Sequence, residues 1–169
     1  MRDKISIPRV QQLHPAVRQE VAELIDKAEA LFPVSIAIRI VQGLRTIKEQ
    51  NDLYAQGRAK PGKKVTNAKG GSSFHNYGLA IDFAILRDKN GDGKYEELSW
   101  DIVADLDKDG MPEWTEIVRV FEAAGWEWGG RWSSLKDYPH LQKTFGFTWR
   151  QLLDKWNKGI INAGYVDLH

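Results

Sequence analysis

Two short segments of this 169-residue chain carry side chains that suit a metal site. The first runs from Ser73 to Asp82 and contains His75, and the second contains Asp137 and His140. Two imidazoles and one carboxylate are a ligand set suited to catalytic zinc, because three protein ligands leave the fourth tetrahedral position open for water. Asp137 then remains as a carboxylate near that water, where a general base for hydrolysis would lie.

The composition narrows the classes of function. The chain has 24 Lys and Arg against 23 Asp and Glu, a formal net charge of +1, so we expect no strong attraction to nucleic acid. Cysteine is absent, and a transition-metal site must therefore use imidazole and carboxylate ligands. The start of the chain has no apolar signal-peptide core, and the most apolar stretch, 34–41, is too short to span a bilayer. We expect no signal peptide and no stable membrane insertion.

The elements that must position these residues follow from the hydrophobic pattern. Apolar residues recur at helical spacing from Val17 to Leu31, with Pro15 acceptable in the first turn, and predict an amphipathic helix. Alternating apolar residues predict a strand over about 34–42. The segment 46–56 is predicted to be a helix, with Thr46 and Glu49 as a capping box. A basic loop over 58–72 then leads into the first metal motif and could form one wall of a cleft.

The second half of the chain continues this mixed pattern. Asp82 lies in a predicted strand, where Ala80 and Ala84 are its neighbours on the same face and leave room for a metal. We expect a helix that ends at Gly125, a short strand over 139–142, a helix over 148–158, and a packed extension after it. No repeat or linker divides the chain. The predicted fold class is therefore α+β, with a small, mainly antiparallel sheet flanked by helices.

The joined motifs resemble those of the peptidoglycan metallopeptidases grouped with lysostaphin, D-Ala-D-Ala carboxypeptidases and the hedgehog signalling domain. The likeness is strongest to the L-alanyl-D-glutamate endopeptidases of phage endolysins and cell walls. It covers about residues 41–140 and includes Gln42-Gly43-Leu44-Arg45-Thr46 and Asn67-Ala68-Lys69-Gly70-Gly71, besides the His and Asp motifs. No segment outside this region matches a wall-binding module.

The resemblance implies a role for each candidate residue. It implies zinc ligands at His75, Asp82 and His140, with Asp137 as the base. It also implies that Arg45 and Ser73 contact the polarised carbonyl of the substrate. From the residues alone, the alternative for Arg45 is a surface ion pair, and the alternative for Ser73 is a hydroxyl in a turn. A guanidinium is permanently charged, so Arg45 could stabilise a developing oxyanion.

Two aspartate-rich segments form a second feature. Residues 105–116 match a calcium loop whose candidate ligands are Asp105, Asp107, Asp109, Met111, Glu113 and Glu116. Gly110 occupies the sharp-turn position of that loop. A weaker match over 88–99 has Ser99 where the final glutamate is usual, and its candidate ligands are Asp88, Asn90, Asp92, Lys94 and Glu96. The alternative for both segments is a solvated acidic turn. Calcium would order the connection between the two halves of the zinc site.

These observations lead to one expected function and two alternatives. We expect a single metallopeptidase domain over 1–169, with a calcium-binding insertion at about 87–116 and a helical extension at about 147–169. It would hydrolyse peptidoglycan stem peptides at the L-Ala–D-Glu bond as a monomer. If phage-encoded, it would be made in the host cytoplasm and reach the wall with a holin-type helper. A D-Ala-D-Ala carboxypeptidase, in which the base is usually Glu, and an inactive wall-binding module are the alternatives.

Overall fold

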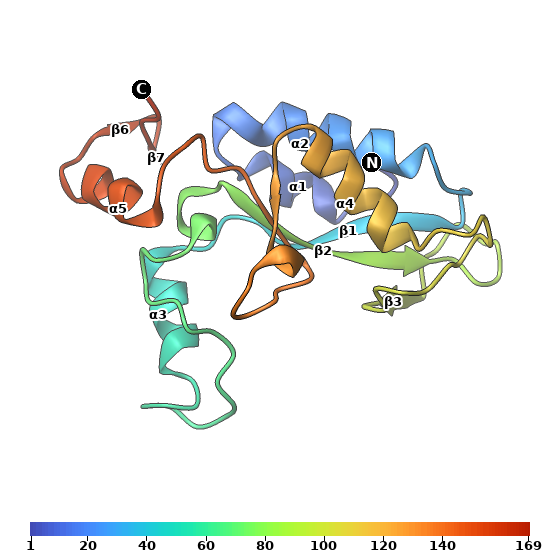
Figure 1. Ribbon diagram of the computed structural model, residues 1–169, viewed down its shortest axis with the longest axis horizontal. Helices are drawn as coiled ribbons and strands as arrows, with labels where there is room; N and C mark the ends of the chain where they lie inside the picture. Colours follow the sequence, from blue (N-terminus) through green and yellow to red (C-terminus); the bar gives the residue numbers. More distant parts are fainter.

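The computed structural model describes residues 1–169 as an antiparallel sheet with helices against it (Figure 1). Five strands form the main sheet: β1 (Ile36–Gln42), β2 (Ala80–Arg87), β3 (Glu97–Ser99), β4 (Glu127–Trp128) and β5 (His140–Gln142). The α-helices are α1 (Ser6–Gln11), α2 (Pro15–Glu29), α3 (Ile47–Ala55), α4 (Glu113–Ala123) and α5 (Trp149–Asn157). The predicted α+β class is confirmed.

Strand β2 is the centre of the sheet. One of its edges pairs with β1 along the whole strand, from Ile36 opposite Arg87 to Gln42 opposite Asp82. The other edge pairs with β5 near the beginning of β2 and with β3 near its end. Strand β4 pairs with the outer edge of β5. All of these pairings are antiparallel, so the segments that carry Asp82 and His140 become neighbours although 58 residues separate them.

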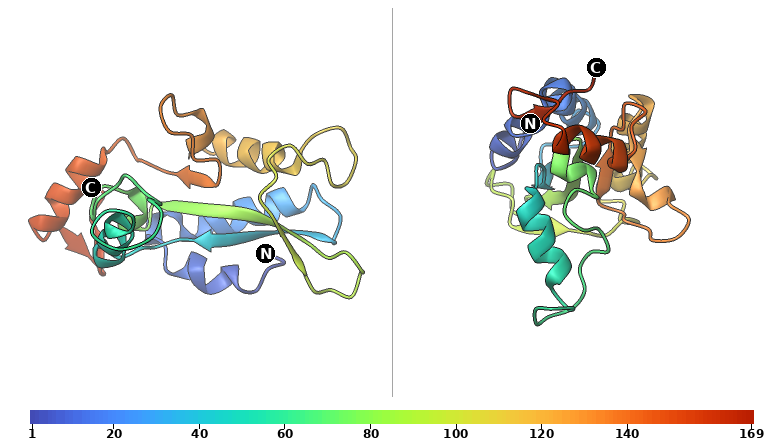
Figure 2. Two further views of the ribbon diagram at one scale, coloured as in Figure 1. Left: turned by 90° about the horizontal axis from the view of Figure 1, so that it is seen from below. Right: turned by 90° about the vertical axis from the view of Figure 1, so that its left-hand side faces the viewer.

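Helices α1, α2 and α4 lie over one face of this sheet (Figures 1 and 2). Ile81, Phe83 and Ile85 of β2 belong to the buried core that these helices share with the sheet. Side chains alternate between the two faces of a strand. Asp82 therefore points to the opposite face, where α3 and the loops on either side of the site lie.

The predicted helices are present, with small differences at their ends. Helix α2 begins at Pro15, and His14 caps it by accepting a hydrogen bond from the Ala16 amide at 3.1 Å. Leu31 was expected on the apolar face of this helix, and that prediction is wrong, because the helix ends at Glu29 and Leu31 is 53% exposed. Phe32 is buried instead. Strand β1 likewise starts two residues later than the predicted residue 34.

The predicted capping box of α3 forms, and α5 has a second one that was not predicted. Thr46 and Glu49 make the capping box of α3, and Thr148 and Gln151 make one on α5. A capping box satisfies two backbone N–H groups that the helix itself leaves without partners. In α3 it holds the first turn directly after Arg45, so it helps to fix the chain direction beside the site.

The end of the chain packs back on its beginning. Residues after α5 form a hairpin of β6 (Ile161–Asn162) and β7 (Tyr165–Val166). The Nε2 atom of buried His14 lies 2.9 Å from the Val166 carbonyl oxygen. None of the helices has the length and apolar character required to cross a membrane.

Candidate active site

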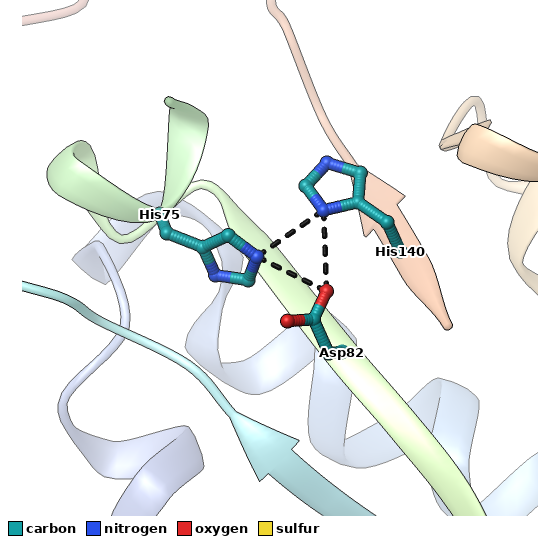
Figure 3. Close-up of side chains that lie close together, drawn as sticks. All are labelled: His75, Asp82 and His140. Carbon is teal, nitrogen blue, oxygen red and sulfur yellow. Dashed lines mark hydrogen bonds and ion pairs between the residues drawn. The ribbon is translucent and has the colours of Figure 1, made fainter. Parts of the chain in front are cut away.

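Each of the three metal-ligand candidates stands on a different local structure. His75 lies in the 3-10 helix η1 (Phe74–Tyr77), which ends at Gly78 in a left-handed conformation with φ 68°. Asp82 is on β2 and His140 on β5, directly opposite each other in the antiparallel pair. Figure 3 shows the three side chains pointing toward one common point. The sheet register thus places two donors, and the turn before β2 supplies the third.

The three donor atoms have the separations that a small tetrahedral cation requires. His75 Nε2 lies 3.1 Å from Asp82 Oδ1 and 3.2 Å from His140 Nδ1, and His140 Nδ1 lies 3.2 Å from Asp82 Oδ1. Ligands about 2.0–2.1 Å from a tetrahedral zinc lie roughly 3.3 Å from one another. Both imidazoles are buried, so few water molecules compete for their lone pairs. The donor set therefore fits zinc in number, type and spacing.

In each histidine the outer nitrogen, the ring nitrogen that faces away from the other two donors, contacts a hydrogen-bond acceptor. His75 Nδ1 donates to the Gly43 carbonyl oxygen at 2.8 Å, and His140 Nε2 donates to the Gln142 side-chain oxygen at 3.0 Å. A neutral imidazole carries one proton, so these contacts leave the inner nitrogens free to act as ligands. The two rings are thereby oriented before any metal binds.

The electrostatics of Asp82 also suit a cation. Burial alone would raise the pKa of this carboxyl, but the adjoining His75 and His140 outweigh burial and hold the pKa of Asp82 well below its ordinary value. Burial would likewise lower the pKa of His140, but the hydrogen bond and charge of Asp82 outweigh burial and shift that pKa upward. Asp82 is consequently ionised at neutral pH and available as an anionic ligand.

Asp137 lies beside the donors on the wall of the same cleft. Its amide donates to the Gly129 carbonyl oxygen at 3.1 Å, and its own carbonyl oxygen accepts from the His140 amide at 3.2 Å. These backbone bonds hold the segment while the side chain stays exposed to the cleft. Partial desolvation, followed by the negative charge of Asp82, raises the pKa of Asp137. An elevated pKa makes a carboxylate a better proton acceptor.

Arg45 is a cleft residue and not part of a surface ion pair. One guanidinium nitrogen, Nη1, donates to Gln50 Oε1 at 2.9 Å, and Nη2 lies 3.8 Å from Asp82 Oδ2. Its Nε atom is buried without a hydrogen-bond partner. The backbone amide of Arg45 also donates to the His75 carbonyl oxygen at 3.0 Å. The guanidinium is thus fixed next to the three donors with hydrogen-bonding capacity to spare.

Ser73 lies in the cleft at the N-cap position of η1, but its hydroxyl makes no capping hydrogen bond. The cleft has a volume of about 610 Å³. Segment 65–73 forms one of its walls and segment 132–137 another. Its apolar lining residues are Leu53, Val65, Ala68, Phe74, Trp132, Leu135 and Trp149. The three donors thus face a cleft lined by both polar and apolar side chains.

The candidate calcium ligands lie away from this cleft. Asp88 follows the last residue of β2, six residues and therefore roughly 20 Å along the strand from Asp82. Carboxylate oxygens of Asp105, Asp107 and Glu113 come within 4.8 Å of one another, as do those of Asp88, Asp92 and Glu96. Figure 2 shows both loops at the end of the sheet opposite α3 and α5.

The two aspartate-rich loops differ in their internal contacts. In the first, Glu113 is fully buried and accepts from the Leu106 and Asp107 amides, while the Oε2 atom of Glu116 is buried without a partner. Burial and the surrounding carboxylates, Asp109 foremost, raise the pKa of Glu116 to about 7. In the second, the Lys94 ammonium lies 3.2 Å from Asp92, which offsets part of the negative charge.

Several residues that complete the site were not identified from the sequence. Gly43 and Gln142 hold the outer histidine nitrogens, and Gln50 holds Arg45. Gly129 has to lack a side chain, since a Cβ atom there would lie 2.5 Å from the Asp137 carbonyl oxygen. Among these residues only Gln142 could have been found from the sequence. It follows His140 by two positions in a strand, and residues two apart lie on the same face.

An antiparallel sheet that presents a His, Asp, His donor set beside a free carboxylate defines a metallohydrolase-type site. Comparison with known proteins gives the family. A family model described as D-alanyl-D-alanine carboxypeptidase matches residues 66–143. The peptidoglycan L-alanyl-D-glutamate endopeptidase CwlK of Bacillus subtilis (strain 168) is 44% identical over 136 residues, which are 80% of this chain and 76% of that protein.

Two further relatives are more distant. The L-alanyl-D-glutamate peptidase of Listeria phage A118 is 27% identical over 81% of this chain, but the match spans only 40% of that protein. The crystal structure of the Serratia marcescens L-Ala D-Glu endopeptidase ChiX covers 84% of this chain and 88% of its own, with a TM-score of 0.51 and 23% identity, and it supports the fold. The chain belongs to the peptidoglycan L-alanyl-D-glutamate endopeptidase family.

Proposed function

We propose that this chain is a zinc peptidase that hydrolyses the L-Ala–D-Glu bond of peptidoglycan stem peptides. The observation that carries the proposal is the convergence of His75, Asp82 and His140 on one point beside the free Asp137 carboxylate. The 44% identical relative, named for the L-alanyl-D-glutamate specificity, supports the choice of bond. The family gives peptidoglycan as the substrate and the cell wall as the place of action.

In the proposed mechanism, Asp137 transfers the proton that hydrolysis requires. When bound, zinc supplies a Lewis acid and an acidified water molecule. In this proposal Asp137 accepts a proton from the attacking water as the oxygen–carbon bond forms at the L-Ala carbonyl carbon. The same carboxyl then returns the proton to the D-Glu nitrogen as the carbon–nitrogen bond breaks. The raised pKa of Asp137 suits both halves of this transfer.

Arg45 and Ser73 are proposed to act on the substrate carbonyl. The Arg45 guanidinium nitrogen Nη2 lies 3.8 Å from Asp82 Oδ2, and the Ser73 hydroxyl is not used by the turn that follows it. Both groups line the cleft with the three donors. Donors fixed where negative charge develops contribute about 10²-fold to 10³-fold to a hydrolysis rate, because they need no reorganisation during the reaction.

We also propose that residues 105–116 bind calcium. The Glu116 oxygen that is buried without a partner beside Asp105, Asp107 and Asp109 supports a cation site, as do the converging carboxylates. In this view the chain is one metallopeptidase domain, with 87–116 as a stabilising insertion and 147–169 as a C-terminal extension. The loop over 88–96 is the weaker candidate, because the Lys94 ammonium lies 3.2 Å from Asp92 and Ser99 stands where the final glutamate is usual.

Mass spectrometry of purified muropeptides after digestion tests the proposed bond. The expected products end in a free L-Ala carboxyl group on one side and begin with a D-Glu amine on the other. The matching family model is described as D-alanyl-D-alanine carboxypeptidase, so release of terminal D-Ala is the specific alternative. Loss of terminal D-Ala alone would replace the proposed specificity, and binding to walls without any product would support an inactive module.

A further inference from the structure

The two histidines of the site differ in how their outer nitrogens are held. The partner of His75 is a backbone carbonyl, which can only accept a hydrogen bond, so His75 must carry its proton on Nδ1. The partner of His140 is the side-chain amide of Gln142, which has an acceptor at one end and a donor at the other. If this amide turned over, it would present N–H to His140 and favour the opposite tautomer. Something else must therefore set its direction.

Glu127 sets that direction. The Gln142 nitrogen Nε2 donates to Glu127 Oε2 at 3.0 Å, and a carboxylate can only accept. Strands β4 and β5 place the two residues opposite each other in the sheet. Because the amide nitrogen is held by Glu127, the amide oxygen must face His140. The proton of His140 is then on Nε2, and its Nδ1 lone pair faces His75 and Asp82.

We propose that Gln142 and Glu127 form a directional hydrogen-bond chain that fixes the tautomer of His140 and so keeps its Nδ1 atom available as a metal ligand. Both are positioning residues, since neither has an atom among the three converging donors. The inference rests on the proposed zinc site. Outer partners of metal-bound histidines generally contribute about 10-fold to 100-fold to metal affinity.

The test compares zinc affinity in three variants of the full chain, measured by competition with a chelator. In Glu127→Gln the partner of Gln142 keeps its shape but can also donate, so the direction is lost, and zinc should bind about 10-fold more weakly. In the double variant Glu127→Gln, Gln142→Glu the carboxylate moves to position 142. It can accept from both His140 and the amide introduced at position 127, so zinc affinity should return toward that of the wild type.

Thr144→Val is the third variant and the matched control. The Thr144 hydroxyl donates to the other Glu127 oxygen, Oε1, at 3.2 Å, so this change removes a neighbouring hydrogen bond and leaves Gln142 bonded. Its zinc affinity should not change. Nitrogen-15 NMR of the His140 ring gives a readout separate from activity. At a pH high enough for the metal-free ring to be neutral, the wild type should carry the proton on Nε2, and Glu127→Gln should show a mixture of both tautomers.

The outcomes separate this inference from the proposed function. Equal zinc affinity in the wild type and Glu127→Gln, or a single unchanged tautomer in both, would overturn the directional chain. A second result would also overturn it. In that result Glu127→Gln binds zinc more weakly, and the double variant melts at the wild-type temperature but does not regain zinc affinity. If the wild type itself bound no zinc, the proposed function would fail first.

Discussion

In the proposed function, Asp137 is the residue whose substitution would separate metal binding from catalysis. It lies in the cleft, but the three converging donors are complete without it. We predict that Asp137→Asn keeps stoichiometric zinc and lowers kcat by about 10²-fold to 10⁴-fold, the usual contribution of a general acid–base group. Metal analysis of the purified variant, together with rates on muropeptides, checks both parts. Loss of zinc in the variant would instead make Asp137 a ligand or a support of one.

The sequence was enough to predict which candidate residues the fold brings together, but not the residues that support them. His75, Asp82, Asp137 and His140 stand in two compact motifs whose types alone indicate hydrolysis. The acceptor for His75 is the carbonyl of Gly43, a group that every residue possesses. This carbonyl can accept from His75 only because of the path of the chain after β1, and the residue types do not predict that path. The zinc-ligand roles of His75, Asp82 and His140, the role of Asp137 as the base, the calcium ligands, and the roles of Arg45 and Ser73 all stay predictions.

Gly129 begins the 3-10 helix η2 (Gly129–Arg131), which packs against the segment that carries Asp137 and His140. A Cβ atom at Gly129 would lie 2.5 Å from the Asp137 carbonyl oxygen and 3.1 Å from the His140 Cβ atom. Gly129→Ala should therefore displace both residues. We expect activity to fall by about 10²-fold and stability to fall by about 1–3 kcal/mol.

Ser133→Ala is the control for that substitution, since Ser133 lies in the loop that follows η2 and does not line the cleft. It should leave both activity and the free energy of unfolding unchanged. Urea unfolding and muropeptide rates measure the two effects. If Gly129→Ala behaved like Ser133→Ala, the close approach of η2 to the Asp137 segment would not be required for function.

The helices and strands differ in how well their sequences predict them. Helices α2, α3 and α5 carry clear periodicity or caps and could be predicted within about two residues, the usual spread of helix boundaries. For α4 only the end was predicted, also within two residues. Helix α1 has only six residues and includes Pro8, so its periodicity is too short to recognise. Strand β4 has two residues, and it exists because β5 offers an edge to pair with. Such elements depend on tertiary contacts.

Helix α4 also connects the aspartate-rich loop to the site. Its Trp114 directly follows Glu113, packs on Phe83 with ring centroids 4.4 Å apart, and donates its indole N–H to the Tyr138 carbonyl oxygen at 3.3 Å. Trp128 donates to the same oxygen at 2.7 Å. Tyr138 belongs to the segment between the candidate base and the last candidate ligand. Disorder at the start of α4 would therefore loosen the second metal motif.

The pKa of Glu116 gives a pH prediction for this helix. Without calcium, burial and the adjacent carboxylates raise the pKa of Glu116 from 4.5 to about 7. Between these values the folded state binds more protons than the unfolded state, so the contribution of Glu116 to stability is present below about pH 4.5 and is lost as pH rises toward 7. Glu116→Gln mimics the protonated side chain and should remove this loss.

Urea unfolding in calcium-free buffer measures the difference in unfolding free energy between Glu116→Gln and the wild type. The advantage of the variant should grow from about pH 5 to about pH 8, because only the wild type gains a buried charge over this range. A difference that did not vary with pH would mean that Glu116 is ionised at no cost in the folded protein.

At the scale of the whole molecule, the aspartate-rich loops and the cleft lie at opposite ends of β2 (Figure 2). Calcium at 105–116 should therefore act through stability. A ligand that binds only the folded state stabilises it by about 2.7 kcal/mol at 100 times its Kd. We predict that calcium raises the Tm of the zinc-loaded protein and its muropeptide release together.

The double variant Asp105→Ala, Asp107→Ala is the matched comparison for the calcium titration. It removes two of the three converging carboxylates and should abolish the rise in Tm. A rise that persisted in this variant would assign the ion to the loop of Asp88 and Asp92 instead. No response of the wild type at millimolar calcium would make both loops ordinary acidic turns.

The central claim is that His75, Asp82 and His140 hold the zinc ion on which hydrolysis depends. Zinc titration into metal-free wild type and His140→Ala, with cleavage at L-Ala–D-Glu and bound zinc measured on the same samples, tests it most directly. Wild-type activity should rise with bound zinc and level off at one ion per chain, while His140→Ala should bind weakly and stay inactive, because two ligands remain of three. Full activity in the metal-free wild type, or stoichiometric zinc with full activity in His140→Ala, would contradict the assignment.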